Sequence, residues 1–173
     1  MNKFAETKEF YELYSRNVET VYQVAYLHLK NKSDAEDAVQ NIFMKYLSCR
    51  PVFENLKHEA AWFVVASRNY CRDILRSWWK KKRTDEETEM MYEPFDMDTY
   101  GEVTEILMNL PDKYREVLYL YYYLEYSLKE IAEIMKKNEN TVRTQLCRAR
   151  EKMKKYLEKE ETDYEQKRAF ECV

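Results

Sequence analysis

The side chains best suited to binding another molecule are concentrated near the C-terminus of this 173-residue chain. Residues 136–155 carry eight basic and two acidic side chains, a net charge of +6. Val142, Leu146 and Ala149 repeat at helical spacing, which predicts a buried stripe and turns the polar residues between them outward. Arg and Gln can bind base edges in the major groove of DNA, and Lys suits phosphates. The polar residues that we expect to contact duplex DNA are Arg143, Thr144, Gln145, Arg148 and Lys152.

A second basic segment, residues 68–83, has seven basic side chains and one acidic side chain, again a net charge of +6. Four of its polar residues recur at steps of three and four, which lines them along one face of a helix. These residues are Asn69, Arg72, Arg76 and Lys80. Cations interleaved with aromatic side chains suit single-stranded or opened DNA, because phosphates need positive charge and unstacked bases need flat partners. The alternative is that Trp78 and Trp79 cover a core while the Lys run solvates a helix end, where positive charge is favoured.

The sequence contains no recognisable catalytic or metal-binding pattern. The four cysteines are scattered and only two histidines are present, so we predict free thiols, no metal site and no disulfide framework. A glycine-rich phosphate loop and a nucleophile–histidine–acid arrangement are also missing, so we expect neither an enzyme nor a cofactor. The N-terminus has no apolar leader and no apolar run approaches membrane-spanning length, which predicts a cytoplasmic protein that does not insert into membranes.

The elements that must position the basic side chains are predicted to be helices. One Gly and three Pro are too few for the tight turns of a sheet protein, so the composition favours an all-α fold. The net charge of −3 hides a segregation of charge, because residues 84–105 contain nine acidic side chains and no basic ones. This acidic run shows little periodicity over most of its length, and we expect its first part to be a linker between two small domains.

Three helices are expected in the first half of the chain. The first spans about residues 7–30, and the second opens at the capping-box pattern Ser33-Asp34-Ala35-Glu36. The third spans about residues 59–82, apolar at its start and basic at its end. The spacing in the second helix predicts a buried stripe of Ala35, Ala38, Val39, Ile42, Phe43, Tyr46 and Leu47. Off this stripe lie Glu36, Asp37, Gln40, Asn41 and Met44.

The second half has the pattern of a helix-turn-helix. Ser127 and Glu130 form another capping box, and Asn138 is a candidate N-cap for the last helix. Two helices joined by a short turn, the second of them basic, are typical of this motif. The stripe expected to be buried in the last helix is Val142, Leu146, Ala149, Met153 and Leu157. We expect the run Tyr119–Tyr123 to pack in the core with its hydroxyls at the rim, and the tail from about residue 160 to be frayed.

The order of these parts resembles the small two-domain sigma factors, the extracytoplasmic-function (ECF) type of the sigma-70 family. The resemblance spans about residues 4–158, with five motifs in the right order and at the right gaps. They are DAEDAVQNIF at 34–43, AWF and SRN within 61–69, LPDKYREV at 110–117, SLKEIAEI at 127–134, and TVR and RAR within 141–150. The resemblance implies a sigma-2-like helical bundle (1–83), an acidic linker (84–102), a sigma-4-like helix-turn-helix domain (103–160) and a polar tail (161–173).

The resemblance also implies a transcription initiation factor that binds core RNA polymerase, directs it to promoters and is commonly restrained by an anti-sigma protein. The residues that would bind core polymerase are Asp34, Asp37, Gln40 and Asn41. The residues that would capture the opened −10 element are Phe53, Asn55, Asn69, Arg72, Arg76 and Lys80. Those that would bind the −35 element as duplex are Arg143, Thr144, Gln145, Arg148 and Lys152.

Three positions depart from the pattern of the family. Lys136 stands where the turn usually has Gly, Lys137 where it usually has an apolar residue, and Gln145 where a basic residue is common. The promoter sequence is therefore not carried over. An alternative function is a stand-alone helix-turn-helix regulator that binds duplex operators, but its sensor or dimerisation domain has no reason to carry the basic segment 68–83. A protein-binding adaptor leaves both basic segments unexplained.

Overall fold

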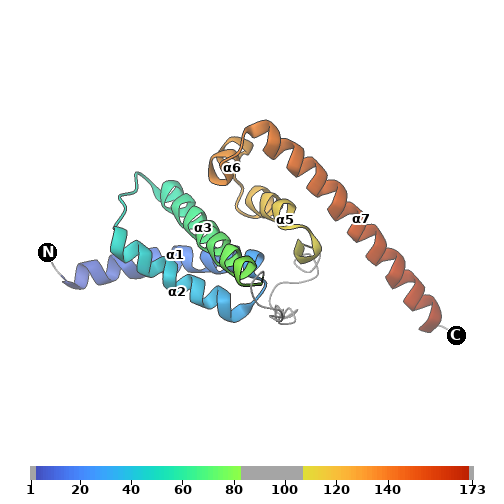
Figure 1. The fold of residues 1–173 in the computed structure, drawn as a ribbon, viewed down its shortest axis with the longest axis horizontal. Coiled ribbons are helices and arrows are strands. Elements are labelled where there is room, and N and C mark those ends of the chain that lie inside the picture. Colours follow the sequence, from blue (N-terminus) through green and yellow to red (C-terminus); the bar gives the residue numbers. More distant parts are fainter. Residues whose placement is uncertain (1–2, 83–106, 172–173) are drawn as a thin grey trace. The chain divides into compact units, whose positions relative to one another are not determined.

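The computed structural model describes residues 3–82 and 107–171, and only the backbone of residues 3–6, 81–82 and 159–171. Every regular element in these two ranges is a helix (Figure 1), in agreement with the all-α prediction. The chain divides into two compact units, which we describe separately. The acidic segment 84–102, which we expected to be a linker, lies outside the described residues.

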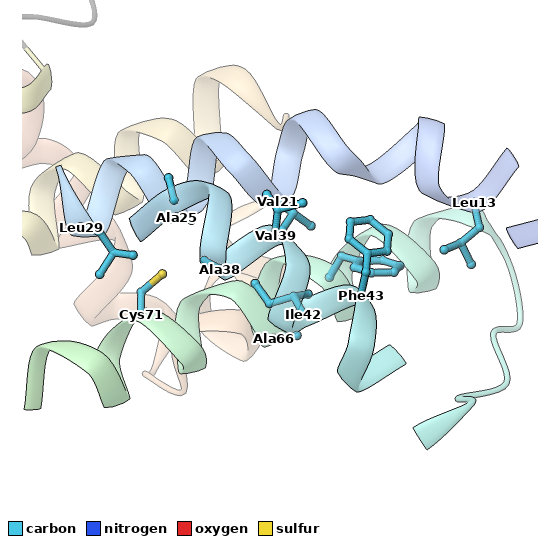
Figure 2. Packing of buried hydrophobic residues seen from close by; sticks show 12 residues of the cluster. Leu13, Val21, Ala25, Leu29, Ala38, Val39, Ile42, Phe43, Ala66 and Cys71 are labelled. Carbon is cyan, nitrogen blue, oxygen red and sulfur yellow. The ribbon is translucent and has the colours of Figure 1, made fainter. Parts of the chain in front are cut away.

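The first unit is a bundle of three helices, α1 (Lys3–Leu29), α2 (Lys32–Cys49) and α3 (Leu56–Lys82), in which each helix packs against the other two. Figure 2 shows that the buried side chains between them come from all three helices. Val21 and Ala25 of α1, Ile42 of α2 and Phe63 of α3 are at most 1% exposed. Apolar burial of this kind is the main source of stability for a small helical bundle.

Helix α2 follows the predicted pattern over most of its length. Ala35, Ala38, Val39, Ile42 and Phe43 are buried. The five residues expected off the stripe are exposed. Leu47 was expected at the end of the stripe and is 43% exposed, so that part of the prediction is wrong.

The start of α2 differs from the predicted capping box. The N-cap is Asn31, whose side-chain oxygen accepts a hydrogen bond of 2.9 Å from the backbone N–H of Asp34. Ser33 already lies inside the helix. Both Asn and Ser are favourable caps, so the local sequence alone did not distinguish the two registers.

The second unit contains α5 (Asp112–Leu118), the π-helix η1 (Tyr119–Tyr123), α6 (Leu128–Met135) and α7 (Glu139–Glu171). Both predicted caps are confirmed. Ser127 and Glu130 form a reciprocal capping box, and the side-chain oxygen of Asn138 accepts 2.7 Å from the N–H of Thr141. Helix α7 packs on α5 and α6, and its residues Val142, Leu146 and Ala149 are buried as expected.

Two expectations for α7 are wrong. Leu157 was placed on the buried stripe and is 41% exposed, since the last buried residue among the described side chains of α7 is Ala149. The backbone of residues 160–171 is helical, where we expected a frayed tail. The side chain of Met153 is half-buried, at the edge of the covered part.

The tyrosine run forms a π-helix that is only partly in the core. Tyr119 and Leu120 are buried, which agrees with the prediction, whereas Tyr122 and Tyr123 are 59% and 57% exposed. The guanidinium of Arg150 lies 5.4 Å from the ring centres of both Tyr121 and Tyr122. The rim therefore holds whole aromatic rings rather than hydroxyl groups alone.

Buried Arg115 ties the segment before α5 to the rest of the second unit. Its Nε donates to the carbonyl oxygen of Leu107 at 3.2 Å, and its Nη2 donates to that of Leu110 at 2.9 Å. These charge-assisted hydrogen bonds satisfy a guanidinium that is 3% exposed. They hold Pro111 and the start of α5 in place, and α5 packs against α7.

Within the described ranges, no helix is both long enough and apolar enough to cross a membrane. The same part of the chain holds no cluster of side chains that could bind a metal ion. The three described cysteines are free thiols, with Cys71 buried and Cys49 and Cys147 exposed.

Candidate nucleic-acid interfaces

The turn between α6 and α7 sets the position of the last helix. Lys136 adopts the left-handed conformation (φ 52°, ψ 51°), and its N–H donates to the carbonyl of Glu133. The N–H of Lys137 donates to the carbonyl of Ala132 at 2.9 Å. These two hydrogen bonds form a Schellman motif, which usually has Gly at the left-handed position. A Lys there costs on the order of 1 kcal/mol, and the turn forms despite that cost.

An open hollow of about 460 Å³ lies along the start of α7. It brings together three of the five residues predicted to contact duplex DNA, Thr144, Gln145 and Arg148. Lys152 approaches the same surface, since its Nζ lies 5.9 Å from the ring centre of Tyr114, which also lines the hollow. Polar residues at the start of the second helix of this motif can contact base edges in the major groove.

The fifth predicted residue, Arg143, lies away from this hollow. At 100° per residue it is about 140° from Arg148 around the axis of α7. Its Nη2 donates to Glu139 Oε1 at 2.9 Å, one turn earlier on the same helix. The structure therefore separates Arg143 from the other four residues.

Several polar residues that line the hollow were not predicted from the sequence. Lys113 comes from the first turn of α5, and its Nζ lies 5.0 Å from the centre of the Tyr114 ring. Asn140 and Thr141 come from the first turn of α7. Position in the first turn was a usable signal for Asn140 and Thr141, whereas only the packing of α5 on α7 reveals Lys113.

Gln145 is held by a residue of the turn. Lys137 Nζ donates to Gln145 Oε1 at 3.0 Å, and both side chains are half-buried. This contact bridges the turn and the predicted base-reading face.

The basic segment of the first unit forms one face of α3. Arg72, Arg76 and Lys80 are exposed and Asn69 is half-buried, on the side of α3 opposite the buried Cys71. Asp73 Oδ1 lies 3.7 Å from Arg76 Nη1, but both side chains are more than 70% exposed, so this ion pair is weak. The side chains of residues 81–83 lie outside the description.

The two tryptophans of this segment have different environments. Trp78 is half-buried and packs against the core of the bundle, as the structural alternative predicted. Trp79 is 59% exposed. One ring therefore stabilises the bundle and the other is accessible beside the basic face.

The loop before α3 is fixed by packing and capping. The ring of Phe53 stacks on Tyr46 with 6.3 Å between centroids and meets Trp62 edge-on at 6.0 Å. Asn55 Oδ1 accepts 2.9 Å from the N–H of His58, in the first turn of α3. The two residues of this loop that were predicted to bind the −10 element thus have structural contacts. Phe53 is half-buried and Asn55 is exposed.

The predicted polymerase-binding residues lie together on α2. Asp37, Gln40 and Asn41 are exposed and Asp34 is half-buried. Asn41 Nδ2 donates to the carbonyl oxygen of Asp37 at 2.8 Å. Burial raises the pKa of the Tyr70 hydroxyl, and the negative charges of Asp37 and Asp34 raise it further. The Tyr70 hydroxyl of α3 therefore interacts electrostatically with this acidic face, and Tyr70 was not among the residues predicted from the sequence.

Family models match both units of the chain. The model of sigma-70 region 2 matches residues 13–81, and the model of sigma-70, region 4 matches residues 100–153. The chain is 34% identical to RNA polymerase sigma factor SigV of Bacillus subtilis over 142 residues, which cover 81% of this chain and 86% of SigV. The chain belongs to the sigma-70 family.

Two further relatives, each described as an ECF RNA polymerase sigma factor, identify this sigma factor as one of the ECF type. SigM of B. subtilis is 30% identical over 152 residues, 83% of this chain and 91% of SigM. SigW is 29% identical over 175 residues, 89% of this chain and 88% of SigW. The expected function is therefore confirmed: the sigma factor binds core RNA polymerase and promoters, and it is not an enzyme. The region 2 match also removes the basis for a stand-alone regulator.

A solved structure shares the fold of this sigma factor. The sigma factor RpoE of Bartonella quintana, crystallised with the anti-sigma factor NepR, aligns with a TM-score of 0.70 and 20% identity. The alignment covers 87% of this chain and 98% of RpoE.

Proposed function

We propose that this sigma factor divides promoter recognition between its two units and binds core RNA polymerase through α2. The acidic segment 84–102 would connect a polymerase-binding and −10-binding unit (1–83) to a −35-binding unit (103–160). The residues 161–173 would lie outside both. Acting on polymerase and promoters, the protein would be cytoplasmic and under the control of an anti-sigma factor.

The −35 element would bind at the start of α7. The hollow that contains Thr144, Gln145 and Arg148 supports this assignment, because it presents a guanidinium, an amide and a hydroxyl on one surface. Such groups hydrogen-bond to base edges in the major groove. Lys113 and Lys152 flank the Tyr114 ring at the edge of this surface and suit the phosphates on either side.

The −10 element would bind along the basic face of α3. Three exposed cations, those of Arg72, Arg76 and Lys80, follow one line beside the exposed ring of Trp79. An opened strand needs cations for its phosphates and flat surfaces for its unstacked bases. Phe53 and Asn55 would contribute from the loop before α3, at the other end of the helix.

Core polymerase would bind the face of α2 that carries Asp34, Asp37, Gln40 and Asn41. The exposure of the last three supports this role, since their side chains make little contact with the bundle. Acidic and amide groups of this kind favour a basic partner surface through complementary charge.

One observation chiefly supports the proposal: the two basic faces lie on two separate compact units. The first unit contains the match to region 2 and the second contains the match to region 4. We therefore expect promoter-directed run-off transcripts when the purified chain is added to core polymerase. Core polymerase without the chain is the control. Failure to initiate at any promoter would contradict the proposal.

The polymerase-binding face can be tested separately by reversing one charge. Asp37→Lys is expected to weaken binding to core polymerase at least tenfold in a fluorescence anisotropy titration, because a like charge in an interface costs several kcal/mol. The matched control is Glu12→Lys, which reverses an exposed charge on the outward face of α1. Equal affinities for both variants would exclude the α2 face as the binding site.

A further inference from the structure

The contact between Lys137 and Gln145 determines which atoms of Gln145 are available to DNA. An ammonium group only donates hydrogen bonds, so the Gln145 atom that faces Lys137 Nζ at 3.0 Å is the amide oxygen Oε1. The amide nitrogen Nε2 therefore points the other way. Gln145 lines the hollow along α7, so Nε2 is the group that it can present there.

The turn holds Lys137 in position for this contact. Its backbone N–H is fixed to the carbonyl of Ala132 by the Schellman motif, and the left-handed Lys136 precedes it. The side chain is half-buried against the second unit. Because the backbone is fixed on one side and the ammonium is bonded on the other, few rotamers of Lys137 remain available.

A glutamine with both amide groups available pairs with adenine. Its oxygen accepts from adenine N6 and its nitrogen donates to N7. Lys137 holds Oε1 toward the turn, so the first of these hydrogen bonds requires Oε1 either to accept a second donor from that position or to leave a charge-assisted one. The group of Gln145 that is left for the hollow, Nε2, carries two N–H donors and no acceptor. Guanine matches two donors, because its major-groove edge presents the acceptors O6 and N7.

We propose that Lys137 is a specificity-determining residue that turns Gln145 from a reader of adenine into a reader of guanine. The inference rests on the proposed −35 role of α7 and adds the base that its central glutamine selects. Lys137 acts here as a positioning residue through the amide of Gln145.

The experiment is run-off transcription by the holoenzyme on a promoter library in which every position of the −35 element is randomised. The base pair that Gln145 contacts is identified as the position whose preference disappears in Gln145→Ala. At that position we expect guanine for the wild type. In Lys137→Met, which keeps the length of the side chain and removes the ammonium, the ratio of adenine to guanine should rise at least about 5-fold, the effect of one lost base-edge contact.

Three controls separate this effect from a change in the fold and from any action of Lys137 that does not pass through Gln145. Lys137→Arg retains a donor for Oε1 and should keep the preference of the wild type. Lys137→Leu places an apolar residue where Schellman motifs commonly have one, so it should fold and should change the preference as Lys137→Met does. In the Gln145→Ala background, Lys137→Met should leave the remaining −35 preferences unchanged.

Three outcomes would overturn the inference. The first is an unchanged ratio of adenine to guanine in both Lys137→Met and Lys137→Leu. The second is the same change of preference in the Gln145→Ala background, and the third is a Gln145→Ala holoenzyme whose −35 preferences all equal those of the wild type. In each of these cases promoter-directed transcription by the wild type continues, which distinguishes them from failure of the proposed function.

Discussion

Arg16 of α1 and Glu59 of α3, which are 43 residues apart in the chain, form a bidentate ion pair that joins the two helices. Arg16 Nε and Nη2 each donate to one carboxylate oxygen of Glu59 at 3.1 Å. Asn17 Nδ2 donates to the same carboxylate at 2.7 Å. Glu59 is 7% exposed, so this buried acid is satisfied by three donors from α1. The contact fixes how the first turn of α3 lies against α1, next to the loop that holds Phe53 and Asn55.

Loss of this carboxylate is expected to destabilise the first unit. Glu59→Ala leaves the buried amide of Asn17 with one of its two acceptors, the carbonyl oxygen of Leu13 at 2.9 Å. The N–H that loses its acceptor costs about 1–3 kcal/mol, while the half-exposed Arg16 can turn to water. All three tryptophans, Trp62, Trp78 and Trp79, lie in this unit, so urea unfolding followed by tryptophan fluorescence measures its stability alone. The control Glu54→Ala, in the exposed loop, should change the free energy of unfolding by less than about 0.5 kcal/mol. Equal effects of the two substitutions would contradict this role of Glu59.

Arg148 and Arg143 should differ in their importance for promoter recognition. Arg148 lines the hollow along α7, whereas Arg143 lies on another side of the helix and pairs with Glu139. Arg148→Ala is expected to weaken −35-dependent initiation by about 1–3 kcal/mol and to relax the preference at one base pair. Arg143→Ala, a matched substitution on the same helix, should change it by less than about 0.5 kcal/mol. Run-off transcription from promoters with and without a −35 element measures both, and a larger loss for Arg143→Ala would exclude the hollow as the base-reading surface.

The left-handed Lys136 offers a stabilising substitution. Lys136→Gly removes the Cβ that is unfavourable at positive φ and should stabilise the second unit by about 1 kcal/mol. Lys136→Ala removes the charge but keeps the Cβ, so it should bring no such gain. Hydrogen exchange of the backbone amides of α6 and α7 reports on this unit separately. Protection that is equal in the Gly and Ala variants would show that backbone strain at this position is small.

Tyr126 makes the second unit sensitive to alkaline pH. Burial raises the pKa of its hydroxyl, and the negative charge of Glu130 adds to the effect. Because the pKa in the folded state lies above the unfolded value of 10.0, the neutral phenol contributes stability below pH 10 that is lost as the pH rises further. The absorbance difference at ultraviolet wavelengths between wild type and Tyr126→Phe should therefore titrate above pH 10 in the folded protein and near pH 10 in urea. A difference that titrates at the same pH in both states would contradict this assignment.

Most of the helices and their capping residues could be predicted from the sequence because they depend on nearby residues. Ser127 and Glu130, three residues apart, define the start of α6, and Asn138 defines the start of α7. The same local periodicity identified the buried stripe of α2 up to Phe43 and the exposed residues Asp37, Gln40 and Asn41 beside it. Charge segregation, which is also a property of the sequence, located the basic faces of α3 and α7.

Contacts between distant residues were decided only by the tertiary structure. The partners of Glu59 lie on another helix, and Lys113 lines the same hollow as Arg148 only because α5 packs on α7. Periodicity shows which side of α7 is apolar, but not how far its partners extend along it, and Leu157 is exposed for that reason. Periodicity likewise assigns Arg143 and Gln145 to the polar part of α7, but it does not show which of the two faces the hollow. The direction of a side chain toward a partner depends on how whole helices pack, and that information is not contained in any short segment of the chain.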